Sequence, residues 1–146
     1  SSSSIFLVVC LTLSLAAAAD PRLSVYSPPE LVAAFKDKGN NITYNIANFG
    51  VNPYGKNLNG IAHYAEPKDG CSPLKPINFT KDFEMGSMSS PIVVIERGKC
   101  TFVTKAMHAQ AIGAKVVLII YDHNDNVEPY VIADDGHGAS INIPTI

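Results

Sequence analysis

Two uninterrupted apolar runs, separated by an amphipathic stretch, constrain the fold of this chain more than any other feature. Ile92–Ile95 and Val116–Tyr121 each have the length and composition of a strand that is buried on both faces. Between them, Thr101 can cap a helix, and one face of that helix carries Phe102, Ala106, Ala109 and Gly113. Strand, helix and strand at this spacing predict a βαβ unit, with parallel strands and a right-handed crossover.

The remainder of the chain predicts shorter elements. Leu23–Tyr26 alternates like a strand and stops at Pro28, and Gly60–Ala65 is a second candidate strand. Glu30–Phe35 can form a helical turn, whereas 66–90 is a long irregular stretch that needs a tether. These patterns indicate a mixed α and β domain.

The N-terminal apolar run has the pattern of a secretory signal peptide. Ile5–Leu15 is apolar with few breaks, and the small residues Ala16–Ala19 precede Asp20. The run is shorter than the roughly 20 apolar residues that span a bilayer. We therefore expect a signal peptide at residues 1–19, with its start incomplete, and a domain over 20–146 whose C-terminal end is truncated. The alternative is a buried core helix.

Removal of residues 1–19 takes Cys10 away and leaves two cysteines, Cys71 and Cys100. An even pair in an oxidising compartment is a disulfide candidate. Asn41 and Asn78 each begin an N-x-T triplet without proline, so both are candidate glycosylation sites. Together these features predict a location in the lumen of the secretory pathway or on the extracellular face of a membrane.

Composition and motifs exclude several function classes. The net charge is −2 and the basic residues are scattered, so nucleic acid is not an expected partner. No catalytic or phosphate-binding motif occurs, and the four histidines are dispersed. The loop from Asp122 resembles a calcium loop, but Val127 and Ala133 stand where glycine and glutamate are needed. We expect no metal, no cofactor and no enzymatic activity.

One exposed turn remains as a candidate site. Arg97 ends a predicted strand beside Gly98, and Cys100 anchors the same turn through the predicted disulfide. An arginine held rigidly there offers a fork of donors to carboxylates or backbone carbonyls. Alternatively, Arg97 pairs inside the domain with Glu96 or Asp122.

The sequence around this turn resembles a known family. Arg97-Gly98-Lys99-Cys100-Thr101-Phe102, followed by Lys105, Ala109-Gln110 and Gly113-Ala114, resembles the signature of protease-associated (PA) domains. Further motifs are similar to the PA domain of plant-type vacuolar sorting receptors: Leu23-Ser24-Val25, Asn48-Phe49-Gly50, Tyr54-Gly55, Glu128-Pro129 and Ile141-Asn142-Ile143-Pro144. The resemblance covers residues 23–146.

The resemblance implies an α+β fold, an open β-barrel or sandwich with flanking helices and one βαβ unit. It also implies a non-catalytic domain that recognises peptide segments of soluble cargo proteins. Carried over to this chain, the peptide-binding residues are Arg97, Gly98, Lys99, Cys100 and Asp134. Membrane attachment would come from a segment beyond Ile146.

Related proteins of other classes use the same kind of domain. It can cover a secreted zinc aminopeptidase or a subtilisin-like protease, or form the lumenal part of a RING-type ubiquitin ligase. It can also be the ectodomain of an intramembrane aspartyl protease. The turns at Asn48-Phe49-Gly50 and Tyr54-Gly55 favour the receptor.

Overall fold

The computed structural model describes residues 7–12, 22–34, 36, 41–42, 44–53, 57–84, 89–121 and 131–146. The predicted cleavage site at Ala19 and the acidic loop from Asp122 lie outside these ranges, as does the side chain of Asn41.

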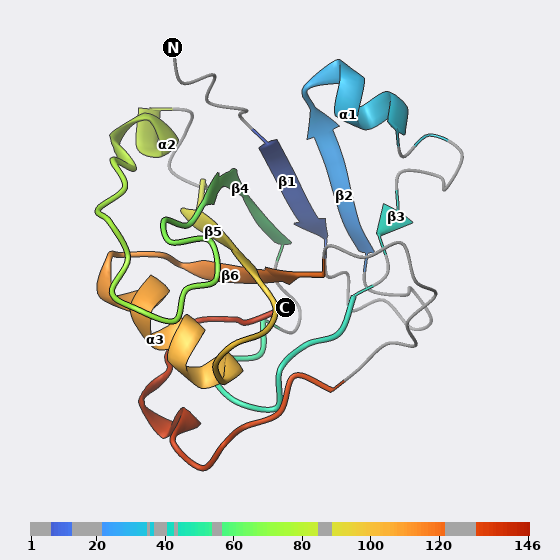
Figure 1. Ribbon diagram of the computed structural model, residues 1–146. Helices are drawn as coiled ribbons and strands as arrows, with labels where there is room; N and C mark the ends of the chain where they lie inside the picture. Colours follow the sequence, from blue (N-terminus) through green and yellow to red (C-terminus); the bar gives the residue numbers. More distant parts are fainter. Residues whose placement is uncertain are drawn as a thin grey trace.

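A single six-stranded mixed sheet forms the centre of the domain (Figure 1), in the order β3-β2-β1-β4-β5-β6. Its strands are β1 (Leu7–Thr12), β2 (Arg22–Ser27), β3 (Asn41–Ile42), β4 (Asn57–Tyr64), β5 (Ile92–Glu96) and β6 (Val116–Ile120). The helices are α1 (Pro29–Ala34), α2 (Thr80–Glu84) and α3 (Phe102–Ala111), with a 3₁₀ turn, η2, at Gly138–Ser140. Strands β4, β5 and β6 run parallel, and the other pairs are antiparallel.

The predicted βαβ unit is confirmed as β5, α3 and β6. Thr101 caps α3, because its Oγ1 accepts a hydrogen bond from the Thr104 N–H at 3.2 Å. The helix stops before Gly113, whose φ of +94° is a conformation that glycine adopts without strain. The mixed α and β architecture is therefore as predicted, and the β structure is open, in the form of one six-stranded sheet.

Part of the predicted leader forms a strand. β1 pairs with β2 on one side and with β4 on the other, so it connects the antiparallel and parallel halves of the sheet. Removal of residues 1–19 would take this strand out of the sheet. Cleavage after Ala19 stays a prediction.

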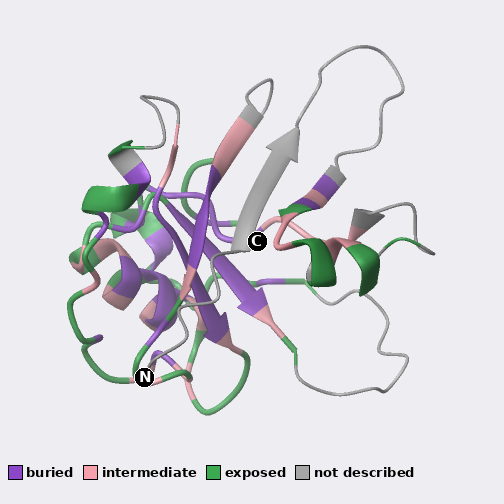
Figure 2. Cartoon of the chain, turned by 90° about the horizontal axis from the view of Figure 1, so that it is seen from above, coloured by how far each residue is buried: buried purple, intermediate pink, exposed green. Residues whose placement is uncertain are grey.

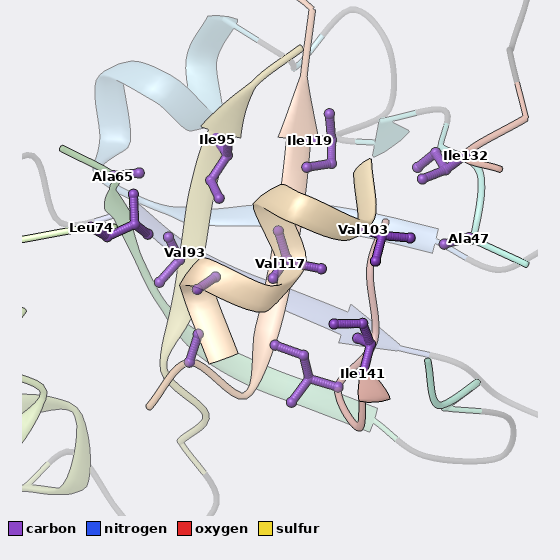
Figure 3. Close-up of a cluster of buried hydrophobic side chains, with 14 of the residues drawn as sticks. Ala47, Ala65, Leu74, Val93, Ile95, Val103, Val117, Ile119, Ile132 and Ile141 are labelled. Carbon is purple, nitrogen blue, oxygen red and sulfur yellow. The ribbon is translucent and has the colours of Figure 1, made fainter. Parts of the chain in front are cut away.

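Successive residues of β5 and β6 point to opposite faces of the sheet and build two cores. Val93, Ile95, Val117 and Ile119 lie beneath α3 (Figure 3), where they pack with helix residues such as Val103. The alternate positions contribute to a second cluster, comprising Leu23, Ala62, Ile92, Val94, Val116, Leu118 and Ile146. Figure 2 shows the buried residues concentrated in the central strands and the exposed ones on surrounding loops. Coverage on both faces explains the continuous apolar runs.

The C-terminal segment extends the sheet beyond β6. Val117 donates its N–H to Pro144 O at 2.9 Å, and Ile119 donates to Ile146 O at 2.7 Å. On the other side, the Ala47 N–H donates to Thr145 O at 2.8 Å. These bonds satisfy the backbone of β6 along its outer edge and attach residues 44–47 to the domain.

Helix α2 attaches the irregular 66–90 stretch to strand β4. Asp82 is fully buried, and both of its carboxylate oxygens lie 3.0 Å from Nε2 of His63 on β4. Phe79 packs edge-on against the same imidazole, with ring centroids 5.4 Å apart. This polar contact was not predicted from the sequence.

Substitution of Gly60 tests how closely β4 approaches the segment before β5. A Cβ at Gly60 would lie 1.9 Å from Ser90 O and 2.9 Å from the Ile92 side chain, so Gly60→Ala must displace backbone. We expect it to lower the free energy of unfolding by about 3 kcal/mol in urea titrations. The control is Gly136→Ala, where nothing lies within 4 Å and only the positive φ opposes a side chain, for about 1 kcal/mol. Equal stability of the two variants would contradict this packing.

Candidate functional site

The candidate site is the RGKC loop, residues 97–100, at the carboxyl end of β5. The Arg97 N–H donates to Ile120 O at 2.9 Å, which fixes the start of the loop against β6. Gly98 has φ +104° and Lys99 has φ +67°, so two consecutive residues adopt the left-handed region. Such a conformation is uncommon for lysine, and it persists only where surrounding contacts hold it.

A disulfide supplies the first of these contacts. Cys71 and Cys100 are bonded, with their Cα atoms 5.7 Å apart and a sequence separation of 29. The bond joins the RGKC loop to the segment that follows β4. On the chain-entropy model, closing a loop of this length stabilises the fold by about 4 kcal/mol.

Buried Lys105 supplies the second contact. Its side chain is fully buried under the loop, although it comes from helix α3. Its ammonium donates to Gly98 O at 2.7 Å and to Asp69 O, and lies 3.6 Å from Cys71 Sγ. Burial lowers the pKa of this ammonium below its ordinary value. The lysine thus joins the RGKC loop, the disulfide and the 66–71 loop at one point.

The 66–71 loop carries the third contact. The Asp69 carboxylate accepts from Lys99 Nζ at 2.9 Å and from the Cys71 N–H at 3.1 Å. The hydrogen bond from Lys99 is the main reason that the pKa of Asp69 falls below 3.8, and the Cys71 N–H adds to it. The same bond raises the pKa of Lys99. This pair holds the Lys99 side chain of the RGKC loop against the 66–71 loop.

Gly70 and His108 complete the support of the 66–71 loop. Gly70 has φ +61°, and a Cβ there would lie 2.8 Å from Ile95 Cγ2 in the core. Its carbonyl accepts a hydrogen bond from His108 Nδ1 at 2.8 Å. His108 of α3 therefore holds the 66–71 loop against the helix.

Arg97 has an aromatic neighbour that the sequence did not suggest. Its guanidinium lies over the Tyr121 ring, with Cζ 5.2 Å from the ring centroid. Glu96 instead faces Lys68, whose Nζ lies 4.0 Å from Glu96 Oε1, and Asp122 is outside the described residues. The Arg97 side chain is exposed at the end of β5.

Asp134 lies in a neighbouring loop and is engaged there. Its Oδ1 accepts from the N–H groups of Gly136 and Gly138 at 2.9 and 2.8 Å. The adjacent Asp135 has a lowered pKa, chiefly because it accepts a hydrogen bond from the Thr101 hydroxyl. The structure thus brings the Asp134 loop to the helix cap next to Cys100, while peptide contact by Asp134 stays a prediction.

The roles of two residues of this site were not predicted from the sequence. Asp69 and Lys105 organise the loop, yet neither was assigned a role from the sequence. The available signal was positional, because Lys105 lies three residues after Phe102 and four before Ala109, which places it on the buried face of α3. A lysine at a buried helical position needs partners, and the loop carbonyls are those partners.

Three further observations concern the surface and the composition of the described residues. Asn78 is exposed, and its Oδ1 accepts from the Thr80 N–H at 3.0 Å, so this N-x-T triplet lies on the surface. Among the residues that the structure describes, no three His, Cys, Asp or Glu side chains gather as a metal site. In the same part of the chain, no helix has the length and apolar character needed to cross a bilayer.

The pH dependence of stability tests the Asp69–Lys99 pair. A carboxylate with a lowered pKa in the folded state stabilises the fold above its unfolded pKa, and this contribution is lost as the pH falls through the folded pKa. Wild type should therefore gain free energy of unfolding over Asp69→Asn as the pH rises from 2 to about 5, and the difference should then stay constant. In a Lys99→Met background the gain should shrink. An unchanged difference across this range, measured by urea unfolding, would contradict the pair.

Comparison with known proteins agrees with this geometry. The PA domain profile matches residues 56–146, which include the RGKC loop and the bonded pair Cys71 and Cys100. The chain is 36% identical to vacuolar-sorting receptor 7 of Arabidopsis thaliana over 134 residues, covering 85% of this chain and 19% of the receptor. It is 36% identical to Arabidopsis signal peptide peptidase-like 2 over 85 residues, covering 57% of the chain and 13% of that protein.

A third relative is the receptor homology region, transmembrane domain- and RING domain-containing protein 2 of Arabidopsis. It is 35% identical over 106 residues, which cover 70% of this chain and 22% of the relative. The chain therefore spans less than a quarter of the length of each of these three proteins. The shared part is the domain described above, and the chain belongs to the PA domain family.

Proposed function

We propose that this PA domain is a non-catalytic module that binds peptide segments of soluble cargo proteins, as the lumenal part of a membrane-attached, vacuolar-sorting-receptor-like protein. The observation that carries the proposal is the RGKC loop. It is exposed at the end of a buried strand, and a disulfide, a buried lysine and an ion pair hold it in place. A loop held in this way binds an extended peptide without a further entropic cost of ordering itself.

The chemistry of Arg97 suits such a ligand. Its guanidinium lies over the Tyr121 ring, with Cζ 5.2 Å from the ring centroid, and the N–H donors of a guanidinium lie in its plane. A planar fork of donors matches carboxylates and the carbonyls of an extended peptide. Stacking restricts the side chain before binding, so fewer rotamers are lost when a peptide arrives.

The setting supports a location in the secretory pathway. Disulfides persist in oxidising compartments, and Cys71 and Cys100 form one. The exposed Asn78 triplet is a candidate N-glycosylation site, and the predicted leader is a secretory signal. Both are features of proteins that enter the secretory pathway. Homology with the PA domain of a protein named for vacuolar sorting favours receptor function.

The other two relatives suggest an alternative function for the domain. A peptidase-like protein and a RING domain-containing protein share this module but differ from the sorting receptor in name and in the remainder of the chain. In either case the domain would be an accessory that contacts polypeptides, and catalysis would belong to another part of the protein. The longer coverage of this chain by vacuolar-sorting receptor 7 favours the receptor.

Substitution of Arg97 tests peptide binding. Peptides enriched on wild type from a displayed library of random twelve-residue sequences serve as probes in calorimetric titrations. We expect Arg97→Ala to weaken their affinity at least tenfold, or about 1.4 kcal/mol. Its free energy of unfolding should fall by less than about 1 kcal/mol, because the exposed stacking contact is weak.

The control is Lys115→Ala, an exposed residue just before β6, at the opposite end of that strand from Arg97. It should bind the same peptides as tightly as wild type. Equal affinities of the Arg97 variant and wild type, or no enriched peptide at all, would contradict the proposal.

A further inference from the structure

The disulfide between Cys71 and Cys100 lies directly beside a buried positive charge. Lys105 Nζ is 3.6 Å from Cys71 Sγ, and the Lys105 side chain is fully buried. Cys100, in contrast, is only partly buried, and its neighbours in the chain, Lys99 and Thr101, are exposed. The bond therefore has a buried cation next to one sulfur, while the other sulfur belongs to the exposed RGKC loop.

The surroundings of Cys71 Sγ suit a free sulfur as well as a bonded one. Asp69 O lies 3.5 Å from this sulfur and Gly98 O lies 3.6 Å from it, and both carbonyls accept hydrogen bonds from the Lys105 ammonium. A sulfur in a disulfide has no hydrogen to donate to these carbonyls, whereas a thiol can donate to either of them. A thiolate can instead accept from the ammonium. Cys71 thus has a partner in each protonation state of its reduced form.

The charge of Lys105 acts on this sulfur without a carboxylate in between. The ammonium contacts two neutral carbonyls and the sulfur itself. The Asp69 carboxylate, on the neighbouring loop, is bound to Lys99 at 2.9 Å. Burial lowers the pKa of the Lys105 ammonium, and a thiolate beside it opposes that effect, so the two charges stabilise each other.

We infer that the Cys71–Cys100 bond is a thiol–disulfide exchange site, at which a dithiol reductant attacks Cys100 Sγ and Lys105 stabilises Cys71 as the leaving thiolate. This inference goes beyond the proposed function and does not depend on it. A neighbouring cation favours the thiolate form of a cysteine, and a more stable thiolate leaves faster in thiol–disulfide exchange. The partial burial of Cys100 and its exposed neighbours direct the attack to that sulfur.

Two exchange steps complete the reduction. In the first, a thiolate of the dithiol bonds to Cys100 Sγ, and the Cys71–Cys100 bond breaks with its electron pair on Cys71. In the second, the other thiolate of the dithiol attacks the reductant sulfur that is bonded to Cys100, and Cys100 leaves. The protein disulfide gains two electrons, the dithiol becomes a disulfide, and the two protons of the dithiol pass to the cysteine sulfurs or to solvent. Cys100 leaves directly before Thr101, the N-cap of α3, where the positive end of the helix favours a thiolate.

Reduction loosens the RGKC loop without releasing it. The covalent link to the segment after β4 is lost, but Lys105 still donates to Gly98 O, and Lys99 still pairs with Asp69. The exchange therefore switches the loop between a covalently closed state and a state held by polar contacts alone.

The rate of reduction by dithiothreitol tests the role of Lys105. The native protein is incubated with the reagent at a fixed pH, alkylated with a maleimide, and weighed to count the thiols released. We expect Lys105→Met to be reduced about threefold more slowly than wild type or slower still, because the leaving sulfur has lost its cation. A purely structural lysine predicts the opposite sign, since a loosened loop exposes the bond. Reduction of Lys105→Met at the wild-type rate or faster overturns the inference.

The control is Gly70→Ala, which disturbs the 66–71 loop but keeps the lysine. Gly70 has φ +61°, and a Cβ there would lie 2.8 Å from Ile95 Cγ2. This variant should be reduced at least as fast as wild type. Slower reduction of Gly70→Ala would also overturn the inference, because disturbance of the loop would then account for the Lys105 result.

The position of a mixed disulfide tests the inference in wild type alone, even where Lys105→Met does not fold. Glutathione, a monothiol, replaces dithiothreitol, the reaction is stopped with acid, and peptide mass spectrometry locates the adduct. We expect the adduct on Cys100 about five times as often as on Cys71 or more, because Cys71 is the better leaving group. An even distribution, an excess on Cys71 or the absence of any adduct overturns the inference.

Discussion

The buried ammonium of Lys105 is the interaction on which the arrangement of this site depends. A charged group with no access to water is costly unless hydrogen bonds replace its hydration. Here the replacement comes from the Gly98 and Asp69 carbonyls, which belong to two separate loops. Neither loop can move away without leaving the ammonium short of an acceptor. The disulfide between Cys71 and Cys100 closes the same junction covalently, so polar and covalent constraints act on one point.

The parallel half of the sheet gives this junction its position. β4, β5 and β6 end at the same edge, and the loops that follow β4 and β5 meet there. Because the strands are buried on both faces by two apolar clusters, their ends form a rigid base. The exposed side chains of Arg97 and Lys68 lie at the ends of these strands, next to Tyr121 and Tyr64. An exposed binding surface on a rigid scaffold is the usual arrangement for recognition by loops.

The sequence predicts the scaffold better than the site. The apolar runs of β5 and β6 and the Thr101 cap have local signals, so the βαβ unit was predictable from periodicity alone. The roles of Lys105 and Asp69 depend on contacts between residues that are 36 and 30 apart in sequence, and no local pattern encodes their partners. The stacking of Arg97 on Tyr121 was missed for the same reason, since carboxylates were considered as its neighbours and an aromatic ring was not. The strand formed by Leu7–Thr12 was hidden by an apolar composition that also suits a leader.

Amide hydrogen exchange in wild type and Lys105→Met tests most directly whether the lysine holds the two loops. The informative amides are those of Gly70, Cys71 and Cys100, which bond within the loops. We predict that the substitution speeds their exchange at least tenfold while the amides of β5 and β6 keep their wild-type rates. Unchanged exchange at the three loop amides would contradict the account, because the loops would then hold their positions without the buried ammonium.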